Sequence, residues 1–175
     1  MEAEMRLSMK NLKEIKLFAM DVDGTLTDGK IYMGNDGELF KAFNVKDGLG
    51  IKLLKDSGIV PAIITGRNSQ IVSNRCLELG LTEFHQGVKN KAAKLKELMD
   101  QYGLTAEQTA YIGDDMNDLS AIKTAGITFA PSDCAESLKP YIDILLTRPA
   151  GQAPVREAID MILKDRYDFS DFLDL

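Results

Sequence analysis

The sequence lacks any apolar run long enough to cross a membrane, and it contains only two cysteines and one histidine. A membrane-spanning helix needs about 20 consecutive apolar residues, so we expect no contact with a membrane. The charged residues near the N-terminus are not followed by the apolar segment of a signal peptide. With so few cysteines and no such signal, we expect reduced thiols and a cytoplasmic protein.

Basic charge is also scarce. Lys and Arg number 21 against 27 Asp and Glu, which gives a formal net charge of −6. Proteins that bind nucleic acids usually carry a basic surplus, so we expect no nucleic-acid partner. A small anionic substrate is still compatible with this balance, because it responds to the local field of a metal ion and a few basic side chains.

Several common catalytic motifs are missing as well. There is no GxxxxGK[ST] sequence, and Gly48-Leu49-Gly50 lacks the third glycine of a dinucleotide fingerprint. His85 stands at the end of a predicted strand, and Cys76 lies on a predicted helix among apolar residues. We expect both side chains to be structural rather than catalytic.

Apolar runs and amphipathic stretches alternate along the 175 residues, which is typical of βαβ units. We therefore predict an α/β fold of three layers, Rossmann-like, with a mostly parallel sheet in one domain, residues 1–175. The predicted strands are Lys16–Met20, Ile59–Ile64, Thr82–His85, Thr109–Ile112, Ile127–Ala130 and Ile142–Leu146. The predicted helices are Gly48–Asp56, Ser69–Leu79, Lys91–Tyr102, Asn117–Thr124, Ala135–Lys139 and Ala153–Lys164.

Four polar motifs stand at or after the ends of predicted strands. They are Asp21-Val22-Asp23, Thr65-Gly66-Arg67, Lys91, and the run Gly113 to Asp118. A single Asp-x-Asp in a loop is most often a solvated turn, and an acidic run is often a helix cap. The carboxyl ends of parallel strands meet at one edge of a sheet. Four such motifs in this order therefore indicate one site for phosphoryl chemistry.

The residue types suit that chemistry. An ionised Asp21 can attack phosphorus and form a covalent aspartyl-phosphate, which splits a difficult hydrolysis into two steps. Asp23 can protonate the leaving alkoxide and later deprotonate the attacking water. We predict a Mg²⁺ site formed by Asp21, the backbone carbonyl of Asp23 and Asp114, because Mg²⁺ prefers oxygen ligands.

The remaining polar residues of these motifs have supporting roles in this interpretation. Lys91 supplies positive charge to the phosphate, and Thr65 and Gly66 complete the phosphate-binding group. Asp115 and Asp118 are expected to orient the metal ligands without binding the metal themselves.

Residues 30–45 interrupt the alternation and predict a β-hairpin whose turn is Asn35-Asp36-Gly37. This flap follows the Asp21 loop directly, so it should lie over the same crevice. It is too small to close the crevice alone, and we expect a neighbouring subunit to complete the site. The C-terminal tail, residues 165–175, is rich in apolar side chains and is expected to dock on the protein or on a partner subunit.

The four motifs resemble those of the haloacid dehalogenase superfamily of phosphatases over nearly the whole chain. Asp28–Tyr32, Phe43–Gly48, Ile64–Arg67, Gln86-Gly87 and Tyr111–Asp115 are similar to the 3-deoxy-D-manno-octulosonate 8-phosphate (KDO 8-phosphate) phosphatase family. The resemblance implies a fold without a cap domain, a homotetramer, and Mg²⁺-dependent hydrolysis of KDO 8-phosphate in lipopolysaccharide synthesis.

The same resemblance implies roles by position. Asp21 would be the nucleophile, Asp23 the acid/base and Asp114 a further metal ligand. Arg67 would meet the carboxylate of the sugar acid, which suits its forked donors. The other residues that would contact substrate are Arg75, Asn117 and Arg156.

The chain departs from this family in one loop. The family has a glycine-rich run where residues 149–157 read Pro-Ala-Gly-Gln-Ala-Pro-Val-Arg-Glu, and Pro154 stiffens the segment. This loop would lie near the substrate of a neighbouring subunit. The sequence therefore supports the type of reaction more strongly than it supports the identity of the substrate.

Two other functions remain open. One is a phosphatase for a nine-carbon, sialic-type keto-acid 9-phosphate, although such relatives tend to carry glutamate at the position of Arg67. The other is a non-catalytic oligomerisation module, related to the C-terminal domains of sugar-nucleotide synthetases. The intact set of Asp21, Asp23, Lys91 and Asp114 argues against a purely structural role.

Overall fold

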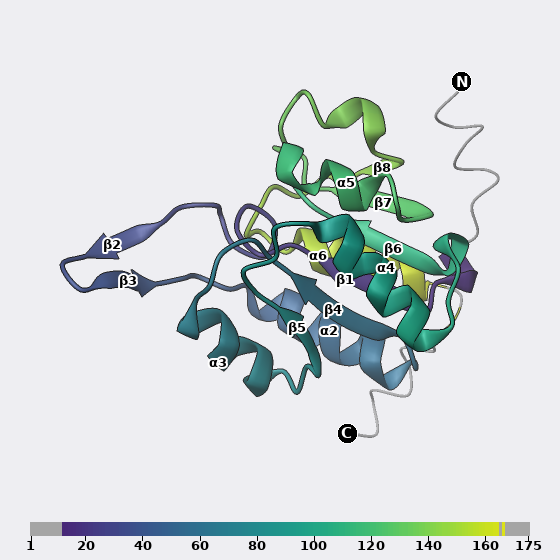
Figure 1. The fold of residues 1–175 in the computed structure, drawn as a ribbon, viewed down its shortest axis with the longest axis horizontal. Helices are drawn as coiled ribbons and strands as arrows, with labels where there is room; N and C mark the ends of the chain where they lie inside the picture. The colour runs from purple at the N-terminus through teal and green to yellow at the C-terminus, as the bar shows by residue number, and fades with distance from the viewer. Residues whose placement is uncertain (1–11, 165, 167–175) are drawn as a thin grey trace.

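A parallel sheet of six strands forms the centre of the protein (Figure 1). The computed structural model describes residues 12–164 and residue 166. The strand order is β5-β4-β1-β6-β7-β8, and every neighbouring pair is parallel. The strands are β1 (Leu17–Met20), β4 (Val60–Ile64), β5 (Glu83–His85), β6 (Thr109–Ile112), β7 (Ile127–Ala130) and β8 (Ile144–Leu145). The predicted α/β class is confirmed.

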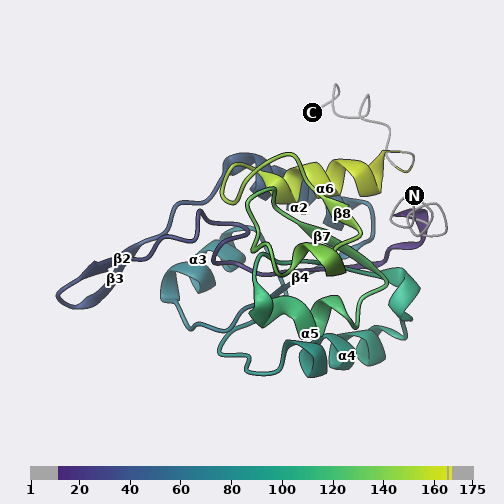
Figure 2. The same ribbon diagram turned by 90° about the horizontal axis from the view of Figure 1, so that it is seen from above.

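Helices cover both faces of this sheet (Figure 2). They are α2 (Val45–Asp56), α3 (Gln70–Glu78), α4 (Lys91–Tyr102), α5 (Leu119–Ile122) and α6 (Pro154–Leu163). Short 3₁₀ helices span Leu12–Glu14, Ala106–Gln108, Met116–Asp118 and Lys139–Tyr141. Residues of α2, α3 and α6 pack in one core cluster, and residues of α4 and α5 pack in the other. The arrangement is therefore three layers.

Strand β1 shows why the layers form. Phe18 and Met20 belong to the core beneath α2 and α6, whereas Leu17 and Ala19 belong to the core beneath α4 and α5. All four side chains are completely buried. A strand covered on both faces has no polar side, and this accounts for its continuous apolar sequence.

The hairpin projects from the body of the protein (Figures 1 and 2). Its strands β2 (Tyr32–Gly34) and β3 (Gly37–Phe40) are antiparallel, and the rings of Tyr32 and Phe40 stack at 4.2 Å. The hairpin strands are shorter than the predicted residues 30–45: β3 ends at Phe40, and helix α2 begins at Val45. The Asn44 side chain caps that helix by accepting a hydrogen bond from the backbone N–H of Lys46.

The predicted helix Ala135–Lys139 is wrong. The chain forms turns there, and a 3₁₀ helix follows at Lys139–Tyr141. Pro140 has no N–H to donate to the carbonyl four residues earlier, so an α-helix cannot continue through it. Pro140 instead lies in the first turn of the 3₁₀ helix, where proline is tolerated.

Two other elements are shorter than predicted. The helix expected at Asn117–Thr124 is split into a 3₁₀ turn and the one-turn α5. The Asp118 side chain accepts the backbone N–H groups of Asp114 and Asp115, just before the 3₁₀ turn. The strand expected at Ile142–Leu146 is reduced to β8. Thr128 and Asp143 replace ladder bonds there, since the side chain of each hydrogen-bonds the backbone N–H of the other.

The loop that departs from the family pattern ends in a strained residue. Ala153 has a φ of 66°, and among the described residues it is the one non-glycine residue with a positive φ. Such a backbone costs an L-residue roughly 1–2 kcal/mol, whereas glycine adopts it freely. Pro154 then opens α6, where its fixed φ suits the first helical position.

In the described part of the chain, no helix combines the length and apolar character that a membrane span requires. The predicted C-terminal tail lies outside the described residues, apart from Arg166. Its guanidinium donates a hydrogen bond to the carbonyl of Ile15 at 2.7 Å.

Candidate active site

Three neighbouring strands bring together the polar residues that follow them. Asp21 follows β1, Thr65 follows β4, and Asp114 comes two residues after β6. Because β1 lies between β4 and β6, these positions are adjacent at one edge of the sheet. Lys91, the first residue of α4, reaches the same place. The structure thus brings together one residue from each of the four motifs.

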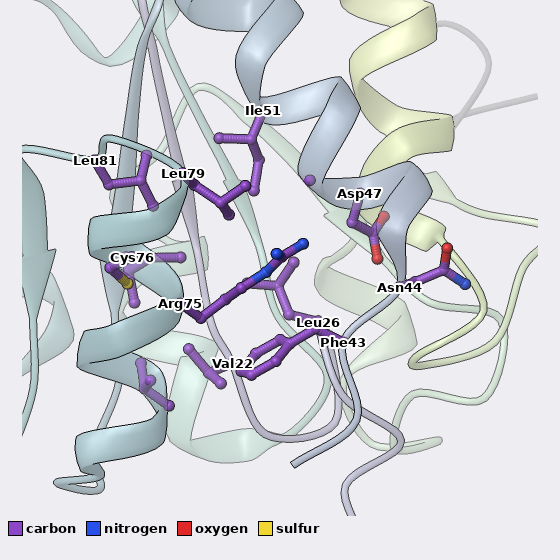
Figure 3. A pocket seen from close by; sticks show the side chains of 13 residues that line it. Val22, Leu26, Phe43, Asn44, Asp47, Ile51, Arg75, Cys76, Leu79 and Leu81 are labelled. Atoms are coloured by element: carbon purple, nitrogen blue, oxygen red, sulfur yellow. The ribbon is translucent and has the colours of Figure 1, made fainter.

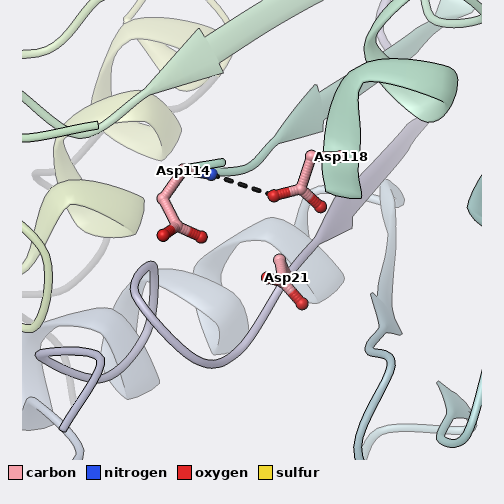
Figure 4. Close-up of side chains that lie close together, drawn as sticks. All are labelled: Asp21, Asp114 and Asp118. Carbon is pink, nitrogen blue, oxygen red and sulfur yellow. Dashed lines mark hydrogen bonds between the residues drawn. The ribbon is translucent and has the colours of Figure 1, made fainter. Parts of the chain in front are cut away.

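Three carboxylates form the centre of this edge (Figure 4). Asp21, Asp114 and Asp118 each offer one oxygen atom, and these atoms lie within 4.8 Å of one another. Lys91 Nζ lies 2.9 Å from Asp21 Oδ1 and 2.6 Å from Asp118 Oδ1. Asp21, Asp118 and Lys91 are all buried. One ammonium among three carboxylates leaves the cluster short of positive charge.

The shortage appears in the pKa values of two of these groups. Burial, together with repulsion from Asp118, raises the pKa of Asp21 to about 6, although Lys91 opposes the shift. Burial and the neighbouring carboxylates raise the pKa of Asp114 to about 7. A divalent cation with oxygen ligands would supply the missing charge. Asp21 and Asp114 therefore fit a bound metal ion, in keeping with their predicted role.

Asp118 holds the cluster in place. Its Oδ1 accepts hydrogen bonds from Lys91 at 2.6 Å and from the Tyr111 hydroxyl at 2.7 Å, and its Oδ2 accepts from the backbone N–H of Asp114 at 3.0 Å. Gly113 makes room for this carboxylate, since a Cβ there would lie 2.4 Å from Asp118 Cγ. With these donors around it, Asp118 orients Lys91 and the loop that carries Asp114.

Gly24 lets the loop after β1 approach Asp114 closely. Its φ of 87° lies in the left-handed region, which glycine adopts without strain. A Cβ at this position would lie 2.1 Å from Asp114 Oδ2. The Thr25 hydroxyl donates to Asp114 Oδ1 at 3.5 Å. Any larger residue at position 24 would displace the Asp114 carboxylate.

The loop after β4 is tied to the segment that leads into α4. The backbone N–H of Thr65 donates to the His85 carbonyl at 3.0 Å, and the Thr65 carbonyl accepts from Val88 N–H at 3.0 Å. Thr65 is buried, whereas Gly66 and Arg67 are exposed. The Thr65 loop and the start of α4 are therefore held in register with each other.

An open cleft of about 380 Å³ lies beside the carboxylates. Its lining residues are Asp23, Asp114, Asp115, Met116 and Asn117. Asp115 and Asn117 are exposed, so both are available to a molecule in the cleft.

Two residues that we did not predict from the sequence lie beside the site: Lys41 contacts Asp23, and Glu38 contacts Lys41. The buried Lys41 forms ion pairs with Asp23 and with Glu38, whose Oε1 lies 2.8 Å from Lys41 Nζ. Burial disfavours the charged form, yet these contacts raise the pKa of Lys41. Arg67 Nε lies 3.7 Å from Asp23 Oδ2. The Glu-x-x-Lys spacing in the hairpin is the sequence signal for the pairing of Glu38 with Lys41, but it does not identify Asp23 as the further partner of Lys41.

Arg75 and Arg156 do not join the acidic cluster within one chain. Arg75 donates to Glu78 at 2.8 Å and lies over the Phe43 ring, 5.8 Å from its centroid. Figure 3 shows Arg75 beside a small pocket of about 20 Å³ lined by α2 and α3. Arg156 Nε donates to Asp160 at 2.6 Å.

The two residues expected to be structural have structural surroundings. His85 Nε2 lies 3.0 Å from Glu83 Oε2. Cys76 is buried in the core, and burial raises the pKa of its thiol to about 11. A thiol of this kind is a poor nucleophile at neutral pH.

The chain is similar to known phosphatases. A family model for haloacid dehalogenase-like hydrolases matches residues 45–126. The 3-deoxy-D-manno-octulosonate 8-phosphate phosphatase KdsC of Escherichia coli is 41% identical over 155 residues, which cover 89% of this chain and 82% of the relative. The chain belongs to this phosphatase family. The resemblance seen in the four motifs is therefore confirmed.

Solved structures of the family have the same fold. The cobalt-bound phosphatase from Haemophilus influenzae has a TM-score of 0.88 and 42% identity, covering 93% of this chain and 98% of that one. The phosphatase from Moraxella catarrhalis, in complex with magnesium, phosphate and KDO, has a TM-score of 0.88 and 41% identity. That comparison covers 99% of this chain and 97% of the other.

The raised pKa values predict how stability depends on pH without metal. Unfolded aspartate has a pKa of about 3.9, whereas those of Asp21 and Asp114 are raised to about 6 and about 7. Between these values the folded chain binds more protons than the unfolded chain, so their contribution to the free energy of unfolding decreases as pH rises. Urea unfolding in EDTA, at about pH 5 and about pH 7.5, measures the change.

Comparison with Asp114→Asn isolates this effect from other groups. The free energy of unfolding of the variant should decrease less, or increase more, than that of wild type between the two pH values. Asp100→Asn, on an exposed position of α4, should follow wild type. Added Mg²⁺ should raise the wild-type Tm at about pH 7.5 more than that of Asp114→Asn. If the free energy of unfolding depended on pH identically in wild type and Asp114→Asn, the acidic cluster would not be short of positive charge.

Proposed function

We propose that the protein is a Mg²⁺-dependent phosphatase that hydrolyses KDO 8-phosphate to KDO and phosphate, through an aspartyl-phosphate on Asp21. The observation that carries this proposal is the buried contact of Asp21 with Lys91 inside a cluster short of positive charge. Relatives of that name, and one structure holding magnesium, phosphate and KDO, support the substrate. We further propose that the chain works as one domain in the cytoplasm.

Asp21 is the proposed nucleophile. Its carboxylate oxygen forms a bond to phosphorus while the bond from phosphorus to the sugar oxygen breaks. Lys91 holds Asp21 Oδ1 at 2.9 Å and so fixes the direction of the carboxylate. The ammonium of Lys91 also offsets part of the repulsion between the Asp21 carboxylate and the phosphate of the substrate. Its own position is fixed by Asp118 on the other side.

Asp23 is the proposed acid and base. It gives a proton to the departing sugar oxygen in the first step. In the second step it takes a proton from the water that attacks the phosphorus, which breaks the bond to Asp21 and releases phosphate. Asp23 lines the open cleft beside Asp114, where a leaving group and a water have access.

A bound magnesium ion would add the positive charge that brings a phosphate dianion to a carboxylate. Asp21, Asp114 and the backbone carbonyl of Asp23 would hold it. Asp118 and Asp115 would not bind the ion but would orient the residues that do. Asp118 already orients the Asp114 loop by accepting a hydrogen bond from the backbone N–H of Asp114.

Substrate binding divides between two groups of residues. Thr65, Gly66 and Lys91 would bind the phosphate. Arg67 and Asn117 would contact the sugar acid, because both are exposed at the same edge. Arg75 and Arg156 make their contacts elsewhere in the chain. We therefore propose that they serve substrate only in a neighbouring subunit.

The alternatives are weaker. A nine-carbon keto-acid phosphate would require the same chemistry, but Arg67 at the edge of the site favours the eight-carbon substrate. A non-catalytic oligomerisation module would have no need for a buried lysine between two carboxylates. Burying such charges costs several kcal/mol per ion unless they are well paired, so we expect a function to maintain them.

Asp21→Asn should reduce turnover at least about 10⁴-fold, because the amide cannot act as the nucleophile. Phosphate release under saturating substrate and Mg²⁺ measures the loss, and circular dichroism checks that the variant is folded. The same change at the exposed Asp100 should leave turnover as in wild type. Activity retained by folded Asp21→Asn would rule out covalent catalysis by this residue.

Substrate identity is tested by kcat/KM for a panel of sugar phosphates that includes both keto-acid phosphates. We expect KDO 8-phosphate to be preferred more than tenfold, about 1.4 kcal/mol of transition-state stabilisation. A preference for the nine-carbon phosphate would change the substrate without changing the chemistry. Failure to hydrolyse any member of the panel would favour the non-catalytic module.

We propose a homotetramer in which a neighbour closes the cleft, because the hairpin projects from the body and exposes Met33, Leu39 and Phe40 (Figure 1). Light scattering of the active enzyme should give four times the mass of one chain. Met33→Lys with Leu39→Lys should reduce the mass and raise KM, since the neighbour no longer completes the site. An active monomer would contradict the proposal.

A further inference from the structure

Lys41 is buried in a segment whose neighbours are exposed. The side chain is 1% exposed, although Leu39 and Phe40 just before it are 63% and 51% exposed. An ammonium loses several kcal/mol of hydration on burial and is retained only with close anionic partners. Lys41 has two, Asp23 and Glu38. Its position is therefore set by charge rather than by apolar packing.

Glu38 anchors this lysine to the body of the protein. Its carboxylate accepts a hydrogen bond from the Ser69 hydroxyl, and Ser69 is the N-cap of α3. Arg67 Nη2 lies 4.0 Å from Glu38 Oε1. The β3 side of the hairpin is thus connected to the start of α3 through Glu38 and to Asp23 through Lys41. In Figure 1, β3 leads back from the hairpin tip toward this region.

The two oxygens of Asp23 have different surroundings. Oδ1 contacts Lys41, and an ammonium only donates hydrogen bonds, so this oxygen is an acceptor in either protonation state of Asp23. Oδ2 lies 3.7 Å from Arg67 Nε, beyond the usual hydrogen-bond distance of about 2.7–3.2 Å. A proton transferred by Asp23 must therefore be carried by Oδ2.

We propose that Lys41 is a positioning residue that fixes the Asp23 carboxylate, so that Oδ2 alone exchanges a proton with the leaving group and with water. This inference rests on the acid/base role of Asp23 in the proposed function. Because Glu38 of β3 holds Lys41, the position of β3 sets the orientation of the Asp23 carboxylate. Proton transfer then depends on a contact 18 residues away from Asp23 in the sequence.

A comparison of leaving groups tests the inference. With enzyme in excess, quenched-flow measurement of the first turnover should show KDO release from KDO 8-phosphate slowed about 10- to 100-fold in Lys41→Met, because an alkoxide needs a proton. Release of 4-nitrophenolate from 4-nitrophenyl phosphate should change less than about threefold, because this anion departs without one. Equal slowing of both, or of neither, would overturn the positioning role.

Two variants define the comparison. Lys30→Met, at the exposed start of the hairpin segment where the side chain is 72% exposed, should match wild type with both substrates. Asp23→Asn should show the same selective slowing as Lys41→Met, and more strongly. If Asp23→Asn slows both substrates equally, the proposed acid role is wrong. If it is selective while Lys41→Met is not, the inference about Lys41 alone fails.

Glu38→Gln keeps the test decisive if Lys41→Met does not fold. The amide preserves the shape of Glu38 but removes the charge that holds Lys41, so alkoxide release should again be slowed more than nitrophenolate release. Conversely, a uniform loss with both substrates in a folded Glu38→Gln would overturn the inference.

Discussion

The candidate active site at the edge of the sheet depends on one buried ammonium group. Lys91 lies between Asp21 and Asp118, and without it two buried carboxylates would face each other at a cost of several kcal/mol per ion. Its position comes from α4, whose Leu95 and Leu98 are completely buried against the sheet. The packing of one helix on an apolar core therefore determines where the positive charge of the site lies.

The carboxylates around this ammonium are not equivalent. Asp118 is completely buried and has three strong donors, so its hydrogen-bonding capacity goes into structure. Asp21 and Asp114 have fewer hydrogen-bond donors around their carboxylates than Asp118 has. Their pKa values are raised to about 6 and about 7. The difference separates the residue that maintains the site from those that are available to a metal ion and a phosphate.

The fold and the centre of the site were predictable because their signals are local. Asp21 follows β1 directly and Asp114 comes two residues after β6, and parallel topology brings such strand ends together. The ion pairs of Lys41 and Glu38 were not predictable, since nothing near them in the sequence names Asp23 as a partner. The helix predicted at residues 135–139 failed because Pro140 outweighs the propensity of the residues before it.

Strand β1 lies inside the sheet although it is the first of the described strands along the chain. Leu17 pairs with Val60 on one side and with Thr109 on the other. Strand β1 therefore has both neighbours only once the chain has been made through β6, and contacts this distant in sequence form slowly. The acidic cluster cannot form until the chain has been made through Asp118, so a nascent chain that carries only Asp21 and Asp23 lacks the other carboxylates of the site.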